Sequence, residues 1–313
     1  MRIWLLATLL FVASTPSMAL DKHTLLSDLK RLSSDEMAGR KPGTEGHKRA
    51  QSFIIERYQK LGLKAFAQDY RHHFSYRKNF KDNPGVNLIA YLPGHIFSDQ
   101  YIVITAHYDH LGTRGERIYN GADDNASGVA AMLSLAQRMV KNRPNHSVIF
   151  FATDAEEDGL KGAEHFVKNP PVPLESIKLN VNLDMIANGG KKRQLYLAGR
   201  KSLPQAIPYF KSFREQVNQT DIKLTFGHDR YRHAHLHRGE DRVNWLNSSD
   251  HGPFNKKGIP YLYFGVDTHA HYHKTSDTYE NVDLTFYVSA VKTIAQALNE
   301  VDQIGFVAVN GKH

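Results

Sequence analysis

Four short apolar runs in this chain each lead into residues of the types that bind metal ions. The runs span residues 101–106, 147–153, 179–183 and 261–266. Between them lie longer stretches whose apolar residues recur every three or four positions, as they do along one face of a helix. Strands that alternate with helices in this way build an α/β domain around a mostly parallel sheet. The pattern therefore predicts a central sheet with helices on both faces.

The rest of the chain continues this alternation. Apolar periodicity predicts helices at 23–33, 44–62, 126–140, 160–167, 207–217, 250–256 and 283–301. Further strands or extended segments are expected at 68–80, 86–92, 194–197 and 221–226. The expected fold class is α/β with three layers, a central mostly parallel mixed sheet flanked by helices.

Composition narrows the class of protein. The chain has 313 residues, 41% of them hydrophobic, which is enough for a substantial core. Its net charge of +8 comes from Lys and Arg that are spread along the chain, with no basic helix to follow a phosphate backbone. No nucleic-acid partner is therefore expected. No repeat or linker divides the chain, so residues 20–313 are expected to form a single catalytic domain.

The first 19 residues have the pattern of a secretory signal peptide. A basic Arg2 precedes the apolar run 3–13, and the small-x-small sequence 17–19 follows it. The run is too short to span a bilayer, so cleavage after Ala19 would release a protein that does not insert into a membrane. Such a protein would be exported, either periplasmic or secreted. It contains no cysteine and hence no disulfide.

The residues that follow the four runs are candidate metal ligands. His107 and Asp109 follow the first run, Glu156 and Glu157 the second, and Asp184 the third. Because open α/β sheets bind ligands at the carboxyl ends of their strands, these side chains should meet at one edge. Histidine and carboxylate side chains gathered there would suit Zn²⁺.

Two further groups complete the candidate set. Asp124 lies in a Gly/Ala/Asn-rich turn, 121–128, directly before a predicted helix. The fourth run is followed by a histidine cluster, and composition alone does not choose among His269, His271 and His273. A second tract contains His228, His233, His235 and His237, for which a solvated loop is the simpler interpretation.

The candidates also have purely structural interpretations. His107 and Asp109 suit a surface histidine beside a hydrogen-bonded aspartate. Asp124 and its neighbours suit the N-cap of the next helix. Glu156 and Glu157 suit a helix N-terminus, where acidic groups are favoured. Asp184 closes an apolar strand and needs a partner that is either a metal ion or an arginine. A functional division of the glutamates is that one binds metal while the other accepts a proton from water.

Six segments, taken together and in order, resemble zinc aminopeptidases of peptidase family M28. The segments are Ala106–His110, Gly121–Gly128, Asp154–Glu157, Asn182–Ile186, Ser249–Phe254 and Tyr272–Thr278. A stretch upstream of them, Leu32–Gly43, is similar to the start of bacterial members. The resemblance implies a mixed sheet between helices.

The resemblance also implies a metal-binding role for each ligand. One Zn²⁺ would be bound by His107 and Asp184, and a second by Glu157 and His273. Asp124 would bridge the two ions, giving two Zn²⁺ per chain.

Three further residues receive catalytic roles from the resemblance. Glu156 would be the general base, Asp109 would orient His107, and Tyr272 would help to hold the developing oxyanion. The peptide bond between Asp124 and Asn125 is expected to be cis.

The implied activity is hydrolysis of N-terminal residues from peptides that have a free N-terminus. A glutaminyl cyclase, which is an acyltransferase with one zinc on a related fold, is the first alternative, although that family lacks the first histidine ligand. A carboxypeptidase of the same superfamily and a non-catalytic receptor-like module are others. Intact ligands together with Glu156 argue against the receptor-like module. No feature of the sequence specifies an oligomeric state.

Overall fold

The computed structural model describes residues 20–228, 247–304 and 306. The expected signal peptide and the histidines at 233, 235 and 237 lie outside the described residues, so cleavage after Ala19 stays a prediction. No helix in the described ranges combines the length and the apolar character needed to cross a membrane.

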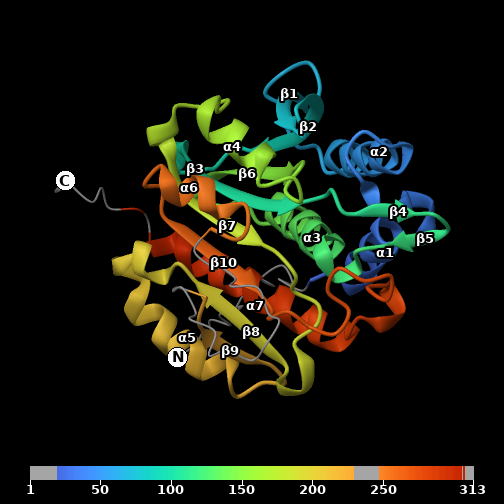
Figure 1. Ribbon diagram of the computed structural model, residues 1–313. Helices are drawn as coiled ribbons and strands as arrows, with labels where there is room; N and C mark the ends of the chain where they lie inside the picture. Colours follow the sequence, from blue (N-terminus) through green and yellow to red (C-terminus); the bar gives the residue numbers. More distant parts are fainter. Residues whose placement is uncertain (1–19, 229–246, 305, 307–313) are drawn as a thin grey trace, which may run out of the picture.

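Ten strands and seven α-helices are present in the described part of the chain (Figure 1). The strands are β1 (Arg71–Lys78), β2 (Lys81–Leu92), β3 (Phe97–His107), β4 (Gly112–Arg114), β5 (Arg117–Tyr119), β6 (His146–Thr153), β7 (Ile177–Leu183), β8 (Gln194–Ala198), β9 (Lys223–Phe226) and β10 (Tyr261–Gly265). The helices are α1 (Lys22–Leu32), α2 (Glu45–Lys60), α3 (Gly128–Lys141), α4 (Lys161–Lys168), α5 (Ile207–Val217), α6 (His251–Lys256) and α7 (Leu284–Ile304).

Eight of these strands form one mixed sheet in the order β1-β2-β6-β3-β7-β10-β8-β9. The four central strands β6, β3, β7 and β10 are parallel to one another. Outside them, the pairs β1–β2, β2–β6 and β10–β8 are antiparallel and the pair β8–β9 is parallel. The register places the end of β3 beside the end of β6, with His107 opposite Thr153. The residues after these central strands therefore emerge at the same edge of the sheet.

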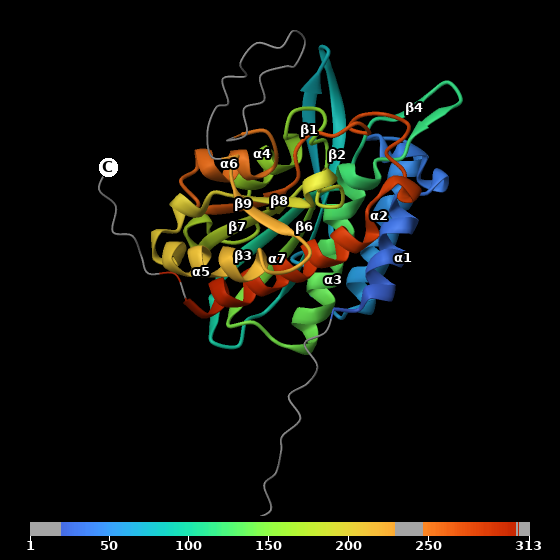
Figure 2. The ribbon, with the colours of Figure 1, turned by 90° about the horizontal axis from the view of Figure 1, so that it is seen from below.

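Helices cover both faces of the sheet, which confirms the predicted three-layer α/β class. Figure 2 shows α1, α2, α3 and α7 together on one side and α4 with α6 on the other. Strand β6 is fully buried and contributes to both cores: Val148 and Phe150 point to the larger one, Ile149 and Phe151 to the smaller one. The sequence of a strand that is buried on both faces is one apolar run, whereas a strand with one exposed face alternates apolar and polar residues.

Each helix and strand predicted from the sequence has a counterpart in the described residues. Helix α2 ends before Gly62, whose φ of 66° suits a glycine just beyond a helix. The segment after residue 190 is part of the same sheet, since it contributes β8, α5 and β9. Several short elements have no sequence-based counterpart, among them the 3-10 helix η1 (Asp35–Arg40) and the two strands of the β4–β5 hairpin.

Asp302 fastens the end of α7 to the start of β6. Its carboxylate accepts hydrogen bonds from the backbone N–H groups of Asn145 (2.7 Å) and His146 (2.9 Å), and the His146 ring nitrogen Nδ1 lies 2.8 Å away. Burial works against ionisation, but the hydrogen bonds from His146 and Asn145 hold the pKa of Asp302 below 3.8. The charged form of this carboxylate therefore stabilises the folded state.

We expect Asp302→Asn to lower the free energy of unfolding by about 1–3 kcal/mol near neutral pH, because it removes the charged acceptor of these bonds. A depressed carboxyl pKa contributes stability that is fully present above the unfolded value of about 3.9 and is lost as the pH falls through the lower folded value. Urea denaturation of both proteins should therefore show the difference shrinking in acid. Asp99→Asn, at an exposed position, is the control. A difference that persists undiminished at low pH would contradict the assignment.

Candidate metal centre

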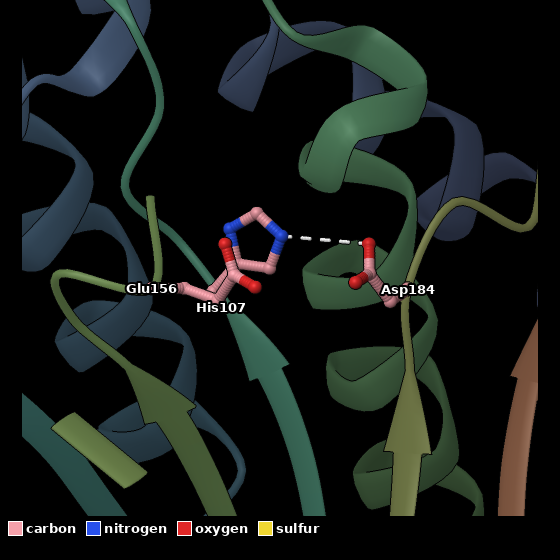
Figure 3. A group of neighbouring side chains, drawn as sticks. All are labelled: His107, Glu156 and Asp184. Atoms are coloured by element: carbon pink, nitrogen blue, oxygen red, sulfur yellow. Dashed lines mark ion pairs between the residues drawn. The ribbon is translucent and has the colours of Figure 1, made fainter. Parts of the chain in front are cut away.

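His107, Glu156 and Asp184 converge at the carboxyl edge of the sheet. His107 is the last residue of β3, whereas Glu156 and Asp184 follow β6 and β7, and Figure 3 shows the three side chains turned toward one another. The Nε2 atom of His107 lies 3.4 Å from Oδ1 of Asp184. One donor atom from each of the three lies within 4.8 Å of the other two, which is close enough for a single metal ion.

A second group of donors lies beside the first. His273 Nε2 is 3.1 Å from Asp124 Oδ2 and 3.5 Å from Glu157 Oε2. His110 also belongs to this group, since its Nδ1 is 2.8 Å from Glu157 Oε1. His110, Asp124 and Glu157 likewise offer donor atoms within 4.8 Å of one another.

Asp124 lies between the two groups. Its Oδ1 is 3.3 Å from Nε2 of His107, and its Oδ2 is 3.1 Å from Nε2 of His273. The two oxygens of one buried carboxylate thus face two different imidazoles. This is the placement that a carboxylate shared by two adjacent metal ions would need.

The turn that carries Asp124 is held by its neighbours. Its backbone N–H and that of Asp123 donate to the Asp277 carboxylate at 3.1 and 2.9 Å. The Oδ1 atom of Asn125 accepts a hydrogen bond from the backbone N–H of Gly128, the first residue of α3, whereas Ser127 at the N-cap makes no side-chain capping bond. The Asp124–Asn125 peptide bond is cis, which confirms that prediction. A Cβ at Gly128 would come within 2.4 Å of the Leu183 carbonyl oxygen, so glycine permits this close approach.

Asp109 connects the end of β3 to the loop after β6. Its carboxylate accepts from the backbone N–H of Glu156 (3.0 Å) and of Glu157 (3.3 Å). The Nδ1 atom of His107 lies 3.2 Å from the Asp109 backbone carbonyl oxygen and 3.9 Å from its carboxylate. In this structure the carbonyl of Asp109, rather than its side chain, is the nearer partner of the His107 ring.

Crowded negative charge dominates the electrostatics. Burial raises the pKa of Glu156 well above 4.5, and the nearby Asp184, Glu157 and Asp250 carboxylates add to that rise, while His107 opposes it. Burial would likewise raise the pKa of Asp124, but hydrogen bonds from His107 and His273 hold it well below 3.8.

His107 shows the converse effect. Burial opposes its protonation, yet the Glu156 and Asp184 carboxylates raise its pKa well above 6.5. The site therefore attracts positive charge.

The donors fit a zinc-type metal ion. Imidazole nitrogens combined with carboxylate oxygens are ligands that Zn²⁺ prefers. Asp184 Oδ1 is buried and has no hydrogen-bond partner among the described residues, although a buried carboxylate oxygen normally has one. Its ion pair within those residues is with His107, not with an arginine.

Sequence reasoning missed several residues around this site. His110 directly follows Asp109, and only its contact with Glu157 identifies it. Asp123 adjoins Asp124 and pairs with His269, whose Nε2 lies 3.0 Å from Asp123 Oδ2. The cluster after β10 is thus divided, because His273 reaches Asp124 whereas His269 reaches Asp123.

Tyr272 lies next to this centre. Its ring stacks on that of His273, with centroids 3.8 Å apart. Burial raises the pKa of Tyr272 above 10, and the surrounding carboxylates, with Asp124 the largest contributor, raise it further. The phenol therefore keeps its proton near neutral pH and is available as a hydrogen-bond donor.

Comparison with known families agrees with this geometry. The sequence model of peptidase family M28 matches residues 87–298, which is more than half of the chain. The chain belongs to peptidase family M28. All the candidate ligands lie inside the matched region, whereas α1, η1 and α2 lie outside it.

Two curated relatives match part of this M28 chain. The alkaline phosphatase isozyme conversion protein of Escherichia coli is 28% identical over 54% of this chain and 52% of its own length. Aminopeptidase YwaD of Bacillus subtilis is 29% identical over 66% of this chain and 42% of its own length. The chain thus spans about half the length of these relatives, or less.

Solved structures share the fold. A zinc aminopeptidase from Bacillus subtilis superimposes with a TM-score of 0.68 at 17% identity, over 90% of this chain and 96% of that one. A glutaminyl cyclase from Fimbriiglobus ruber superimposes equally well, with a TM-score of 0.68 at 21% identity, over 91% and 96% of the two chains. At such identities the similarity shows the fold alone.

We expect chelation of the bound metal to lower the melting temperature, because it leaves the buried carboxylates without a counter-charge. A metal ion present at 100 times its dissociation constant would stabilise the fold by about 2.7 kcal/mol. Differential scanning fluorimetry with and without a chelator, followed by addition of Zn²⁺, measures this shift. Glu157→Gln should respond less to both additions. A melting curve that chelation leaves unchanged would argue against a metal centre here.

Proposed function

We propose that this M28 chain is an exopeptidase that binds two zinc ions and removes N-terminal residues from peptides. The observation that carries the proposal is the position of Asp124, whose two oxygens face His107 and His273. One ion would be held by His107 and Asp184 and the other by Glu157 and His273, with Asp124 between them. When bound, the ions would lower the pKa of a coordinated water toward about 7 and polarise the substrate carbonyl.

Glu156 is the proposed general base. It lies with His107 and Asp184 in one donor group, while the neighbouring Glu157 belongs to the other. The Asp109 carboxylate accepts hydrogen bonds from the backbone N–H groups of both glutamates and so holds the backbone of the loop that carries them. In this role the Glu156 carboxylate would take a proton from the attacking water and return it to the leaving amine.

Two further groups are proposed to act on the substrate. Tyr272, which stays protonated next to His273, would donate a hydrogen bond to the oxygen that becomes negative during attack. The free α-amine of the substrate would lie near the acidic side chains. This attraction between opposite charges favours a peptide with an unblocked N-terminus.

A glutaminyl cyclase is the second candidate, because solved cyclases share the fold as closely as the aminopeptidase does. His107 favours the peptidase, since it completes a second set of donors that a single zinc ion would not need. A carboxypeptidase of the same superfamily is the third candidate, because it would use the same metal ligands as the aminopeptidase and would differ from it only in the substrate pocket.

A substrate panel tests the proposed function. We expect the purified, zinc-loaded protein to release the first residue from aminoacyl chromogenic peptides and to leave N-acetylated peptides intact. Mass spectrometry of a peptide that begins with glutamine distinguishes loss of that residue from loss of ammonia, which is the product of cyclisation. Cleavage of N-acetylated peptides from their C-terminus would instead support a carboxypeptidase.

Substitution of each of the two adjacent glutamates should impair a different property, catalysis in one case and metal binding in the other. Glu156→Gln removes a proton acceptor but none of the proposed ligands, so kcat should fall by about 10²–10⁴-fold or more while two metal ions remain bound. Glu157→Gln removes a charged ligand, so its metal content should fall and excess Zn²⁺ should restore part of the activity. Steady-state kinetics and elemental analysis of both variants measure this difference. Near-full turnover by Glu156→Gln would falsify its role as the base.

A further inference from the structure

Arg40 is a fully buried arginine that none of the proposed catalytic steps uses. Its exposed fraction is 0%, and no carboxylate among the described residues lies within ion-pair distance of it. A buried guanidinium is usually paired with an acidic group, because an uncompensated buried charge is costly. Here the guanidinium donates instead to four backbone carbonyl oxygens.

The four hydrogen bonds join Arg40 to three separate parts of the chain. Nη1 donates to Leu32 at the end of α1 (2.7 Å) and to Asn120 (2.6 Å). Nη2 donates to Gly121 (2.9 Å), and Nε donates to Tyr108 (2.9 Å). Because the guanidinium is planar and its donors form a rigid fork, one side chain sets the spacing of all these segments.

Two of the segments deliver proposed metal ligands. Tyr108 lies between His107 and Asp109, so its carbonyl belongs to the backbone that positions the first histidine ligand. Gly121 begins the turn that carries Asp124, and its carbonyl also accepts the N–H of Ala126 inside that turn. Arg40 therefore ties the loop after β3 to the turn before α3, and both of these segments carry proposed metal ligands.

The charge of Arg40 suits this location. Burial lowers its pKa to about 10, so it remains a cation near neutral pH. The carboxylates of Asp124, Asp277 and Asp109 act on it through space and oppose that lowering. A fixed cation behind the ligands reduces the repulsion among them without occupying the metal positions.

We propose that Arg40 is a positioning residue for the metal centre, through which the N-terminal segment of the chain determines metal affinity. The segment concerned, α1 and η1, lies outside the region that matches the M28 family and contributes no ligand. The inference rests on the metal centre proposed above.

Arg40→Lys tests this inference, because it keeps the charge but removes the fork. We expect the affinity for Zn²⁺, measured by competition with a chromogenic chelator, to fall roughly 10–100-fold, as it does when groups that orient metal ligands are removed. Arg57→Lys is the matched control. Arg57 is another buried arginine of this helical layer, but it pairs with Asp28 at 3.0 Å and does not contact the ligand loops. The Arg57→Lys substitution should lower the melting temperature and leave the affinity for Zn²⁺ unchanged.

A second measurement uses the wild-type protein and does not depend on how the variants fold. If anchoring by Arg40 strengthens metal binding, metal binding must in turn strengthen the anchoring of its segment. Hydrogen exchange should therefore slow over residues 33–40 when Zn²⁺ is added, by more than it slows in α5, which reports general stabilisation.

The outcomes separate the two proposals. Wild-type protein that binds no divalent metal would remove the metal centre itself. If the wild-type protein binds Zn²⁺, two results would each overturn only the role of Arg40. One is an Arg40→Lys variant that binds Zn²⁺ with the affinity of the wild type. The other is wild-type hydrogen exchange over residues 33–40 that Zn²⁺ leaves unchanged.

Discussion

Mutual repulsion among buried carboxylates is the constraint on which the rest of this structure depends. Four parallel strands end at one edge of the sheet, and Asp109, Glu156, Glu157 and Asp184 follow three of them. Like charges in a space with little water cannot all ionise unless positive groups or hydrogen-bond donors lie close to them. The imidazoles, the backbone N–H groups and the proposed metal ions would all reduce the repulsion among these carboxylates.

The centre satisfies this requirement in two layers. The inner layer consists of histidines and carboxylates from the ends of β3, β6 and β7, from the loop after β10 and from the turn before α3. In the outer layer, the Asp109 and Asp277 carboxylates accept hydrogen bonds from backbone N–H groups, and Arg40 donates hydrogen bonds to backbone carbonyls. The outer layer acts on loops rather than on ligands. A small change there is expected to alter the geometry of the whole centre.

The shared fold does not choose among reactions. A zinc aminopeptidase and a glutaminyl cyclase superimpose on this chain with the same TM-score of 0.68, because their sheets are built alike. Function is therefore argued from particular residues at the edge of the sheet. The second donor group and the separation of Glu156 from Glu157 are the features that favour a peptidase.

The amino-acid sequence by itself predicted the layers, the strands and the chemical types of the ligands. A helix such as α1, whose buried residues recur every three or four positions, is predictable from the order of its residues. A strand that is buried on both faces appears in the sequence as one apolar run. The residues just beyond such runs are predictable for the same local reason. His107, Glu156 and Asp184 belong to this group.

Only the tertiary structure decided which of several equivalent side chains meet. The resemblance to the M28 family already implies that His273 is a ligand, but only the structure brings His269 to Asp123 and His110 to Glu157. The structure also placed Arg40 against Tyr108 and Gly121. These partners are far apart in the chain or are indistinguishable by type, and their contacts follow from how the loops pack. No local pattern encodes that packing, because it depends on distances that exist only once the sheet has formed.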